Sequence, residues 1–217
     1  RFHTLRQENG ISGFSRPSES PYDAFIGGHA SNSLSAAYGI AKANTLKKNG
    51  RYVVAVIGDG ALTGGLAYEA LNNAGRCNDK LIVILNHNEM SISKNVGAFA
   101  RYLATIRAKS SYVKAKGRLE RVLDHTPIVG KPIKSILKSS KSVIKNMLYH
   151  STIFEDFGFH YFGPVDGHNL TDLIHILNTV KEQDMPCIIQ VDTVKGKGYH
   201  YAEENPGAFH GISTFDV

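Results

Sequence analysis

Residues 53–60 read VVAVIGDG, and this stretch decides the fold class. Its apolar, β-branched part is typical of a strand that is buried on both faces of a parallel sheet. A second apolar run ends in the sequence NHN at 86–88, with a helix-like stretch between the two runs. Parallel strands joined by one crossover helix bring their carboxyl ends to the same edge of a sheet. The order of these segments therefore predicts that Asp59 and Asn88 lie close together.

The same alternation of helix and strand extends over most of the chain. We predict an α/β fold, in which a parallel sheet has helices on both faces and three functional loops along one rim. Residues 1–28 are rich in Gly, Ser and Pro, and are expected to form an arm or loop. The periodicity predicts strands at 52–57, 81–85, 159–162 and 187–191, helices at 31–46, 62–74 and 170–180, and Gly-rich loops at 163–167 and 195–199.

The composition is that of one large soluble domain. Of the 217 residues, 42% are hydrophobic and 20% are charged, and no apolar run approaches the roughly 20 residues that span a bilayer. No membrane partner is therefore expected. Cys77 and Cys187 lack the spacing of metal ligands, which favours a reducing cytoplasm over a disulfide scaffold. The chain starts at Arg1 with no apolar signal core, so we expect the interior of a longer protein.

The positive charge is concentrated in one segment. The net charge is +6, and Lys and Arg gather at 107–145. The apolar spacing there predicts amphipathic helices, so residues 100–150 are expected to form a basic helical insertion. A solvated surface is the simpler explanation of this charge. A nucleic-acid partner is not expected, because such a surface would want aromatic residues among the charges and only Tyr112 is present.

Asp59 and Asn88 supply the kinds of oxygen that a magnesium ion binds. Mg²⁺ takes near-octahedral oxygen ligands at about 2.0 to 2.1 Å, and usually combines one or two carboxylates with ligand phosphates. Asp59 can give one oxygen, the Asn88 side chain another, and a backbone carbonyl near Met90 a third. A structural Asp in a tight turn is the alternative for Asp59, and the position of Asn88 at the next strand end favours the metal.

Two common nucleotide-binding motifs fit this stretch poorly. A dinucleotide fingerprint needs glycine at position 63, where the sequence has Thr63. A Walker loop needs Gly-Lys-Ser or Gly-Lys-Thr at its end, and none follows here.

Two histidines stand out from the others. His29 lies just before a predicted helix, where a phosphate or the edge of a ligand can bind, and capping of that helix is the alternative. His210 lies between Phe209 and Gly211 in an irregular segment, so we expect it to be positioned rather than packed.

Seven motifs in order resemble those of the 1-deoxy-D-xylulose-5-phosphate synthases, a transketolase-like family that depends on thiamine diphosphate. The resemblance runs over nearly all 217 residues and is weakest in the basic segment. His87 departs from it, since Asp is the commoner family residue at that position. The motifs are GHAS at 28–31, GDGA at 58–61, YEALN at 68–72, NHNEMSIS at 86–93, GPVDGH at 163–168, KGKGY at 195–199 and FHG at 209–211.

The resemblance implies a thiamine-diphosphate-binding fold and a defined reaction. Pyruvate and glyceraldehyde 3-phosphate would condense to 1-deoxy-D-xylulose 5-phosphate and CO₂, the first step of the non-mevalonate isoprenoid pathway, which also serves thiamine synthesis. His210 would face the reacting centre, where an imidazole can move protons or steady charge. By the same resemblance, Mg²⁺ would be held by Asp59, Asn88 and Met90, and the cofactor would be contacted by Gly28, His29, Ala30, Gly60, Ala61, Asn88 and Tyr199.

Residues 1–217 resemble the diphosphate- and Mg-binding domain alone. The family's pyrimidine-binding domain, which supplies a glutamate to the cofactor, and its C-terminal domain have no counterpart here. The isolated piece is therefore expected to hold half of a cofactor site and to show little turnover, whereas the full-length enzyme would be a homodimer. Two alternatives stay open: a transketolase-like sugar-phosphate transferase that acts without decarboxylation, and a non-catalytic anion-binding module.

Overall fold

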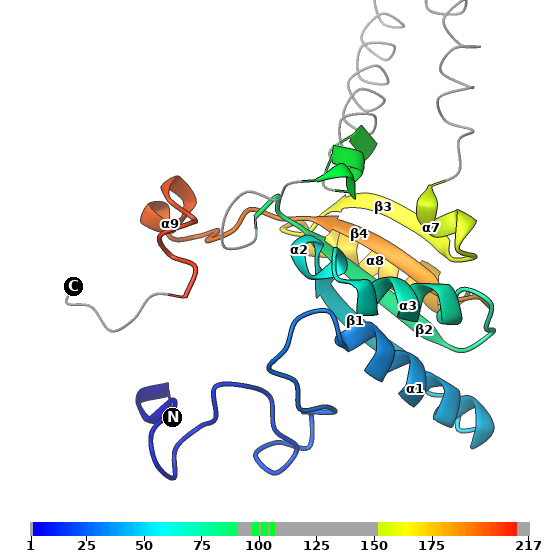
Figure 1. Cartoon of the computed structure of the whole chain (residues 1–217), viewed down its shortest axis with the longest axis horizontal. Helices are drawn as coiled ribbons and strands as arrows, with labels where there is room; N and C mark the ends of the chain where they lie inside the picture. The colour runs from blue at the N-terminus through cyan, green and yellow to red at the C-terminus, as the bar shows by residue number, and fades with distance from the viewer. Residues whose placement is uncertain (1, 91–96, 100, 104, 107–151, 212–217) are drawn as a thin grey trace, which may run out of the picture.

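The computed structural model describes residues 2–90, 97–99, 101–103, 105–106 and 152–211. A four-stranded sheet lies at the centre of this part, with the strand order β1-β2-β4-β3 (Figure 1). All three strand pairs are parallel, as the sequence predicts. The strands are β1 (Val53–Gly58), β2 (Leu81–His87), β3 (His160–Asp166) and β4 (Cys187–Asp192).

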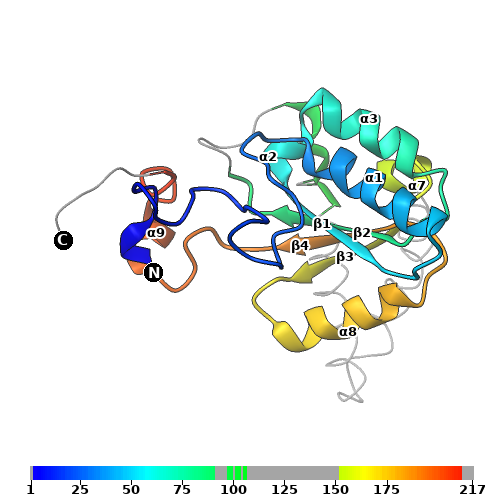
Figure 2. The same cartoon turned by 90° about the horizontal axis from the view of Figure 1, so that it is seen from below.

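Helices cover both faces of the sheet, as Figure 2 shows. One face carries α1 (Ser33–Leu46), α2 (Asp59–Leu62), α3 (Gly65–Ala74) and α7 (Ile153–Asp156), and the other carries α8 (Leu170–Lys181). The side chain of Asn169 caps α8 by accepting the N–H of Asp172 at 3.3 Å. Two short helices, η1 (Phe2–Thr4) and α9 (His200–Glu204), lie outside these layers. None of the helices in the described part is long and apolar enough to cross a membrane.

The two faces of the sheet bury two separate apolar clusters. Val83 and Leu85 of β2 pack with Ala55 and Ile57 of β1 beneath α1 and α3. The alternate residues of β2 and β4, together with one side of α8, form the second cluster. The central strands β2 and β4 are therefore buried on both faces, which explains their nearly continuous apolar sequence.

The prediction that the first strand is fully buried is wrong. Val54 and Val56 are 50% and 61% exposed, whereas the residues that alternate with them are covered. The reason is the strand order, since β1 lies at the edge of the sheet and α8 contacts β3 at the opposite edge. The hydroxyl of Tyr52 donates to the carbonyl of Lys181 at the end of α8.

Several predicted boundaries also shift. The strand expected at 159–162 runs on to Asp166, through an irregularity that contains a cis peptide bond before Pro164. The crossover helix divides into α2 and α3, because Gly64 is extended. Ser31 lies in the left-handed region, so α1 begins two residues later, at Ser33. The basic insertion expected at 100–150 falls almost entirely outside the described residues.

Candidate functional site

The register of the sheet brings the two predicted metal-binding turns together. Gly58 of β1 pairs with Asn86 of β2, so the residues that follow, Asp59 and His87, lie side by side at the carboxyl edge of the sheet. The backbone N–H of Asn88 donates to Asp59 Oδ2 at 3.2 Å. The spatial neighbourhood that the sequence predicts for Asp59 and Asn88 is therefore present.

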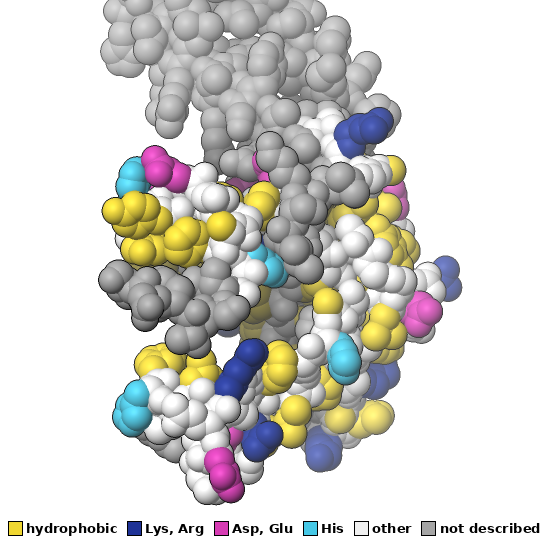
Figure 3. Space-filling view, turned by 60° about the vertical axis from the view of Figure 1, so that its left-hand side comes forward, with side chains coloured by type: hydrophobic (Ala, Val, Ile, Leu, Met, Phe, Trp, Pro, Cys, Tyr) yellow, Lys and Arg dark blue, Asp and Glu magenta, His cyan; other side chains and the backbone are white. Residues whose placement is uncertain are grey.

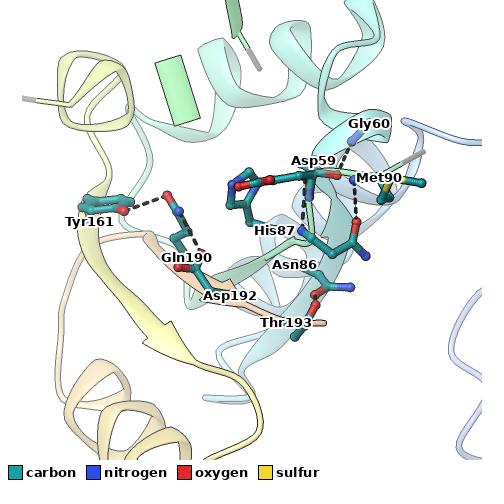
Figure 4. A network of polar contacts seen from close by, with 11 residues as sticks. Asp59, Gly60, Asn86, His87, Met90, Tyr161, Gln190, Asp192 and Thr193 are labelled. Atoms are coloured by element: carbon teal, nitrogen blue, oxygen red, sulfur yellow. Dashed lines mark hydrogen bonds and ion pairs between the residues drawn. The ribbon is translucent and has the colours of Figure 1, made fainter. Parts of the chain in front are cut away.

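The Asp59 carboxylate is 3% exposed and is held by several donors (Figure 4). Its Oδ2 atom accepts the N–H groups of Asn88 and Glu89, at 3.2 and 2.9 Å, and lies 2.8 Å from His87 Nδ1. Its Oδ1 atom accepts the N–H of Gly60 at 2.8 Å. These bonds fix both the position and the rotation of the carboxylate.

The backbone of the second turn adopts an unusual conformation. Glu89 has φ 63°, in the left-handed region that favours glycine. Successive N–H groups in such a turn point to one side and form a concave anion site, which Asp59 occupies here. The N–H of Met90 donates to Asn88 Oδ1 at 3.0 Å and so fixes the Asn88 amide. A strained residue between two candidate ligands is typical of a functional site.

The donor set of these turns fits a magnesium ion. A carboxylate, an amide oxygen and main-chain carbonyls are hard oxygen ligands, and a bound diphosphate would complete them. Among the described residues there is no group of three or more His, Cys, Asp or Glu side chains that could hold a metal. A site built on Asp59 and Asn88 has a single carboxylate, so it depends on neutral oxygens and on the phosphates of a ligand.

The loop before α1 lies against the first of these turns. The Oγ of Ser31 donates to the carbonyl of Ala61 at 2.6 Å. A Cβ at Gly64 would lie 2.3 Å from that Oγ, so the close approach requires glycine there. The predicted cofactor residues immediately before Ser31 are thereby brought to α2, where Gly60 and Ala61 lie. These loop residues are Gly28, His29 and Ala30, all exposed.

Tyr199 and His210 form a second group, away from the sheet edge. The Tyr199 ring packs edge-on against Tyr201 and Phe209, with centroids 5.5 and 5.6 Å apart, and His210 Nδ1 contacts Lys195 Nζ. Figure 1 shows α9 and its flanking loops beyond the carboxyl end of β4, apart from α2. Figure 3 brings this end forward and shows hydrophobic side chains at its surface. The structure therefore does not bring these two residues to Asp59.

Sequence reasoning missed a polar network that joins the central strand β4 to the edge strand β3. The hydroxyl of Tyr161 donates to Gln190 Oε1 at 2.8 Å, and Gln190 Nε2 donates to Asp192 Oδ1 at 3.2 Å (Figure 4). Burial raises the pKa of Tyr161, so its hydroxyl stays protonated and remains a donor. Gln190 within the apolar sequence CIIQV was the available signal, because a polar residue in a buried strand needs a partner.

Solved structures share this fold. The transketolase from Leishmania mexicana has a TM-score of 0.54 and 19% sequence identity, with 87% of this chain and 23% of that chain covered. The transketolase from Campylobacter jejuni has a TM-score of 0.55 and 17% identity, with 89% and 25% covered. At these identities the similarity shows the fold alone. It confirms the predicted transketolase-like α/β architecture.

Curated relatives carry a more specific name. A 1-deoxy-D-xylulose-5-phosphate synthase from Treponema pallidum (strain Nichols) is 54% identical over 217 residues, which is 100% of this chain and 34% of the relative. Another from Clostridium kluyveri is 52% identical over 216 residues, with 35% of the relative covered. The chain thus spans about a third of the length of the curated relatives it matches. A family model described as 1-deoxy-D-xylulose-5-phosphate synthase matches residues 1–193. The chain belongs to the 1-deoxy-D-xylulose-5-phosphate synthase family.

Proposed function

We propose that this chain is the diphosphate- and metal-binding part of a thiamine-diphosphate-dependent synthase. The whole enzyme would condense pyruvate with glyceraldehyde 3-phosphate, giving 1-deoxy-D-xylulose 5-phosphate and CO₂ for isoprenoid and thiamine synthesis. Identity of 54% over all 217 residues to a relative of that name supports the reaction. The remaining two thirds of such a protein would supply the pyrimidine-binding and C-terminal domains, and this piece alone would be nearly inactive. We further propose a cytoplasmic homodimer.

The contact between Asp59 and the turn at 88–90 is the observation that carries this proposal. Asp59, Asn88 and the carbonyl of Met90 would hold Mg²⁺, which would in turn bind the diphosphate. When bound, thiamine diphosphate supplies the electron sink for decarboxylation. The N–H of Gly60 already donates to Asp59. Gly60 would therefore contact the diphosphate through its other atoms, beside Ala61.

The remaining predicted residues would bind and orient the reactants. The loop at 28–30 would contact the cofactor from the side of α2, because Ser31 ties it to Ala61. Tyr199 would contact the cofactor, and His210 would hold or move a proton at its imidazole near the reacting atoms. Since α9 and its flanking loops lie apart from α2 (Figure 1), this part of the site would form only when the segment at 195–211 meets the rest of the enzyme.

Asp59→Ala in the full-length enzyme tests the proposal, with Asp79→Ala as the matched control. Asp79 is also a buried carboxylate, 2% exposed, but it lies just before the amino end of β2, away from the carboxyl ends where Asp59 lies. It pairs with Lys42 at 3.4 Å. Asp59→Ala should lower pyruvate-dependent CO₂ release by at least about 100-fold. Loss of a residue that only orients a metal ligand costs about 10- to 100-fold, and loss of the ligand itself should cost at least as much. Asp79→Ala should keep both turnover and its Mg²⁺ dependence. Near-normal turnover in Asp59→Ala would contradict the ligand role.

A transketolase-like reaction is the second candidate. The fold shared with two transketolases is compatible with this reaction but does not distinguish it from the first. Release of CO₂ from pyruvate by the full-length enzyme would separate the two reactions, since ketol transfer between sugar phosphates releases none. The anion-binding module receives no support from the described residues, because the basic segment lies outside them.

A further inference from the structure

His87 is a buried histidine, and within the part of the chain that the structure describes only one of its ring nitrogens has a hydrogen-bond partner. It is the last residue of β2 and is 2% exposed. Nδ1 lies 2.8 Å from Asp59 Oδ2, whereas Nε2 is buried without a hydrogen-bond partner among the residues that the structure describes. A buried polar atom without a partner lowers stability. A buried imidazole is therefore a costly way to fill this part of the core, and its contact with Asp59 is the interaction that can explain its presence.

The hydrogen between the two side chains belongs to His87. Oδ2 of Asp59 already accepts two backbone N–H groups, and an ionised carboxylate only accepts. The network therefore assigns the proton to Nδ1 of the imidazole. His87 is the third donor to that oxygen, beside the N–H groups of Asn88 and Glu89.

The three donors are anchored differently. Asn88 and Glu89 belong to the turn that follows β2. His87 lies in β2, which pairs with β1 on one side and with β4 on the other, where Asp192 is its partner. Its side chain lies on the face of Val83 and Leu85, above the larger apolar cluster. The imidazole thus ties the carboxylate of Asp59 to the rigid sheet instead of to the loop.

We propose that His87 is a positioning residue for the metal ligand Asp59. Its Nδ1–H holds Oδ2, so that the carboxylate keeps one rotation with or without the ion. This inference rests on the proposed metal site. The partners that orient a ligand's own side chain influence metal affinity without contacting the metal.

His87→Leu and His87→Asn in the full-length enzyme separate the donor from the bulk of the ring. Leu fills similar space without a donor, whereas the Asn amide can place an N–H near the position of Nδ1. Mg²⁺ binding is titrated calorimetrically with thiamine diphosphate saturating. We expect His87→Leu to lower Mg²⁺ affinity by about 10- to 100-fold, and His87→Asn to bind close to the parent.

Gln190→Leu is the control for loss of a buried polar group. Gln190 is 0% exposed and lies on the same face, but its partners are Tyr161 and Asp192. We expect Gln190→Leu to melt at a lower temperature and to keep the parent's Mg²⁺ affinity. If His87→Leu does not fold, His87→Gln replaces it, because the longer amide moves the donor away and should bind about 10-fold more weakly than His87→Asn.

Asp59→Ala in the same titration distinguishes the two ways in which the inference can fail. If Asp59→Ala binds Mg²⁺ like the parent, the metal site itself is wrong. If Asp59→Ala loses binding and His87→Leu keeps it, only the role of His87 is overturned. Equal losses in His87→Leu and His87→Asn, or in His87→Leu and Gln190→Leu, also overturn it, because the donor would not be what matters.

Discussion

The two groups of predicted site residues are held by the fold in different ways. Asp59 is buried at the end of β1, and its carboxylate is bonded to the end of β2 and to the turn that follows it. Tyr199 and His210 lie in the segment 195–211, where their ring contacts and the hydrogen bond to His210 come from within the segment. The sheet thus preorganises the proposed metal half of the site. Changes in the metal half should lower stability and binding together, and changes in 195–211 should lower binding alone.

Asp59→Ala is the largest test of this difference. The change should lower the free energy of unfolding by about 2 to 4 kcal/mol, because the buried His87 and the partly buried N–H groups of the two turns lose their acceptor, and a buried unsatisfied group costs about 1 to 3 kcal/mol. Urea denaturation of the chain measures the loss. Asp59→Asn should lose less, since its amide oxygen still accepts. A change below about 0.5 kcal/mol, the range of ordinary surface substitutions, would contradict the preorganised turn.

The reactivity of Cys187 gives an independent measure of the stability of Asp59→Ala. It is buried in β4, and burial raises the pKa of its thiol to about 11. A thiol reagent therefore reacts with it chiefly when the chain opens. Labelling of Cys187 should be faster in Asp59→Ala than in the parent, and unchanged in variants of 195–211.

Ser31 tests the link between the loop at 28–30 and α2. Ser31→Gly should lower stability by about 1 kcal/mol through the lost bond to the carbonyl of Ala61. Ser31→Ala should lose more, because Ser31 has φ 72° and alanine is strained there, whereas glycine is not. Equal stability of the two variants in urea denaturation would show that the backbone relaxes at this position.

The strand ends could be predicted from the sequence, but the edge of the sheet could not. Two apolar runs with a helix between them suffice to place Asp59 next to Asn88. The same β-branched pattern suits an edge strand and a central strand equally, so it could not predict that Val54 and Val56 are exposed.

The role of His87 was hidden for a different reason. The apolar run stops at Leu85, and polar residues beyond it read as a loop, whereas the backbone pairing continues to His87. Register is a property of two strands together and cannot be derived from one. The separation of Tyr199 from the sheet could not be predicted either, because a sequence motif does not specify how far apart two segments lie in space.

Tyr199→Ala tests the second region. We expect a change in stability of less than about 0.5 kcal/mol, because Tyr199 is 49% exposed. In the full-length enzyme the variant should bind thiamine diphosphate about 2- to 12-fold more weakly, which corresponds to a lost aromatic contact of about 0.5 to 1.5 kcal/mol. Tyr201→Ala is the control, since Tyr201 is 62% exposed and packs on the same ring. Equal weakening in both variants would indicate a role in folding the segment instead of a contact to the cofactor.

Glu203 gives the smallest effect, and it shows how local the second region is. Its carboxylate accepts the N–H of Gly198 at 2.8 Å and lies 3.5 Å from Lys197 Nζ, and these contacts hold the pKa of Glu203 below its ordinary value. Because the folded pKa is lowered, the stabilisation of this loop is present above the ordinary pKa of a glutamate. It is lost as the pH falls through the lowered pKa.

This loss on acidification should stay within 195–211. An NMR titration of the Glu203 carboxyl should give a pKa below that of a free glutamate, and Lys197→Met should raise it. Asp79 offers the contrast: burial alone would raise its pKa, but the Thr45 and Cys77 side chains and the charge of Lys42 lower it. The stabilisation from ionised Asp79 should therefore be lost on acidification in a way that global unfolding detects. The stabilisation from ionised Glu203 should not be detected there. If Lys197→Met shifted the midpoint of urea unfolding, the segment would be coupled to the sheet, and the two regions would not differ as described.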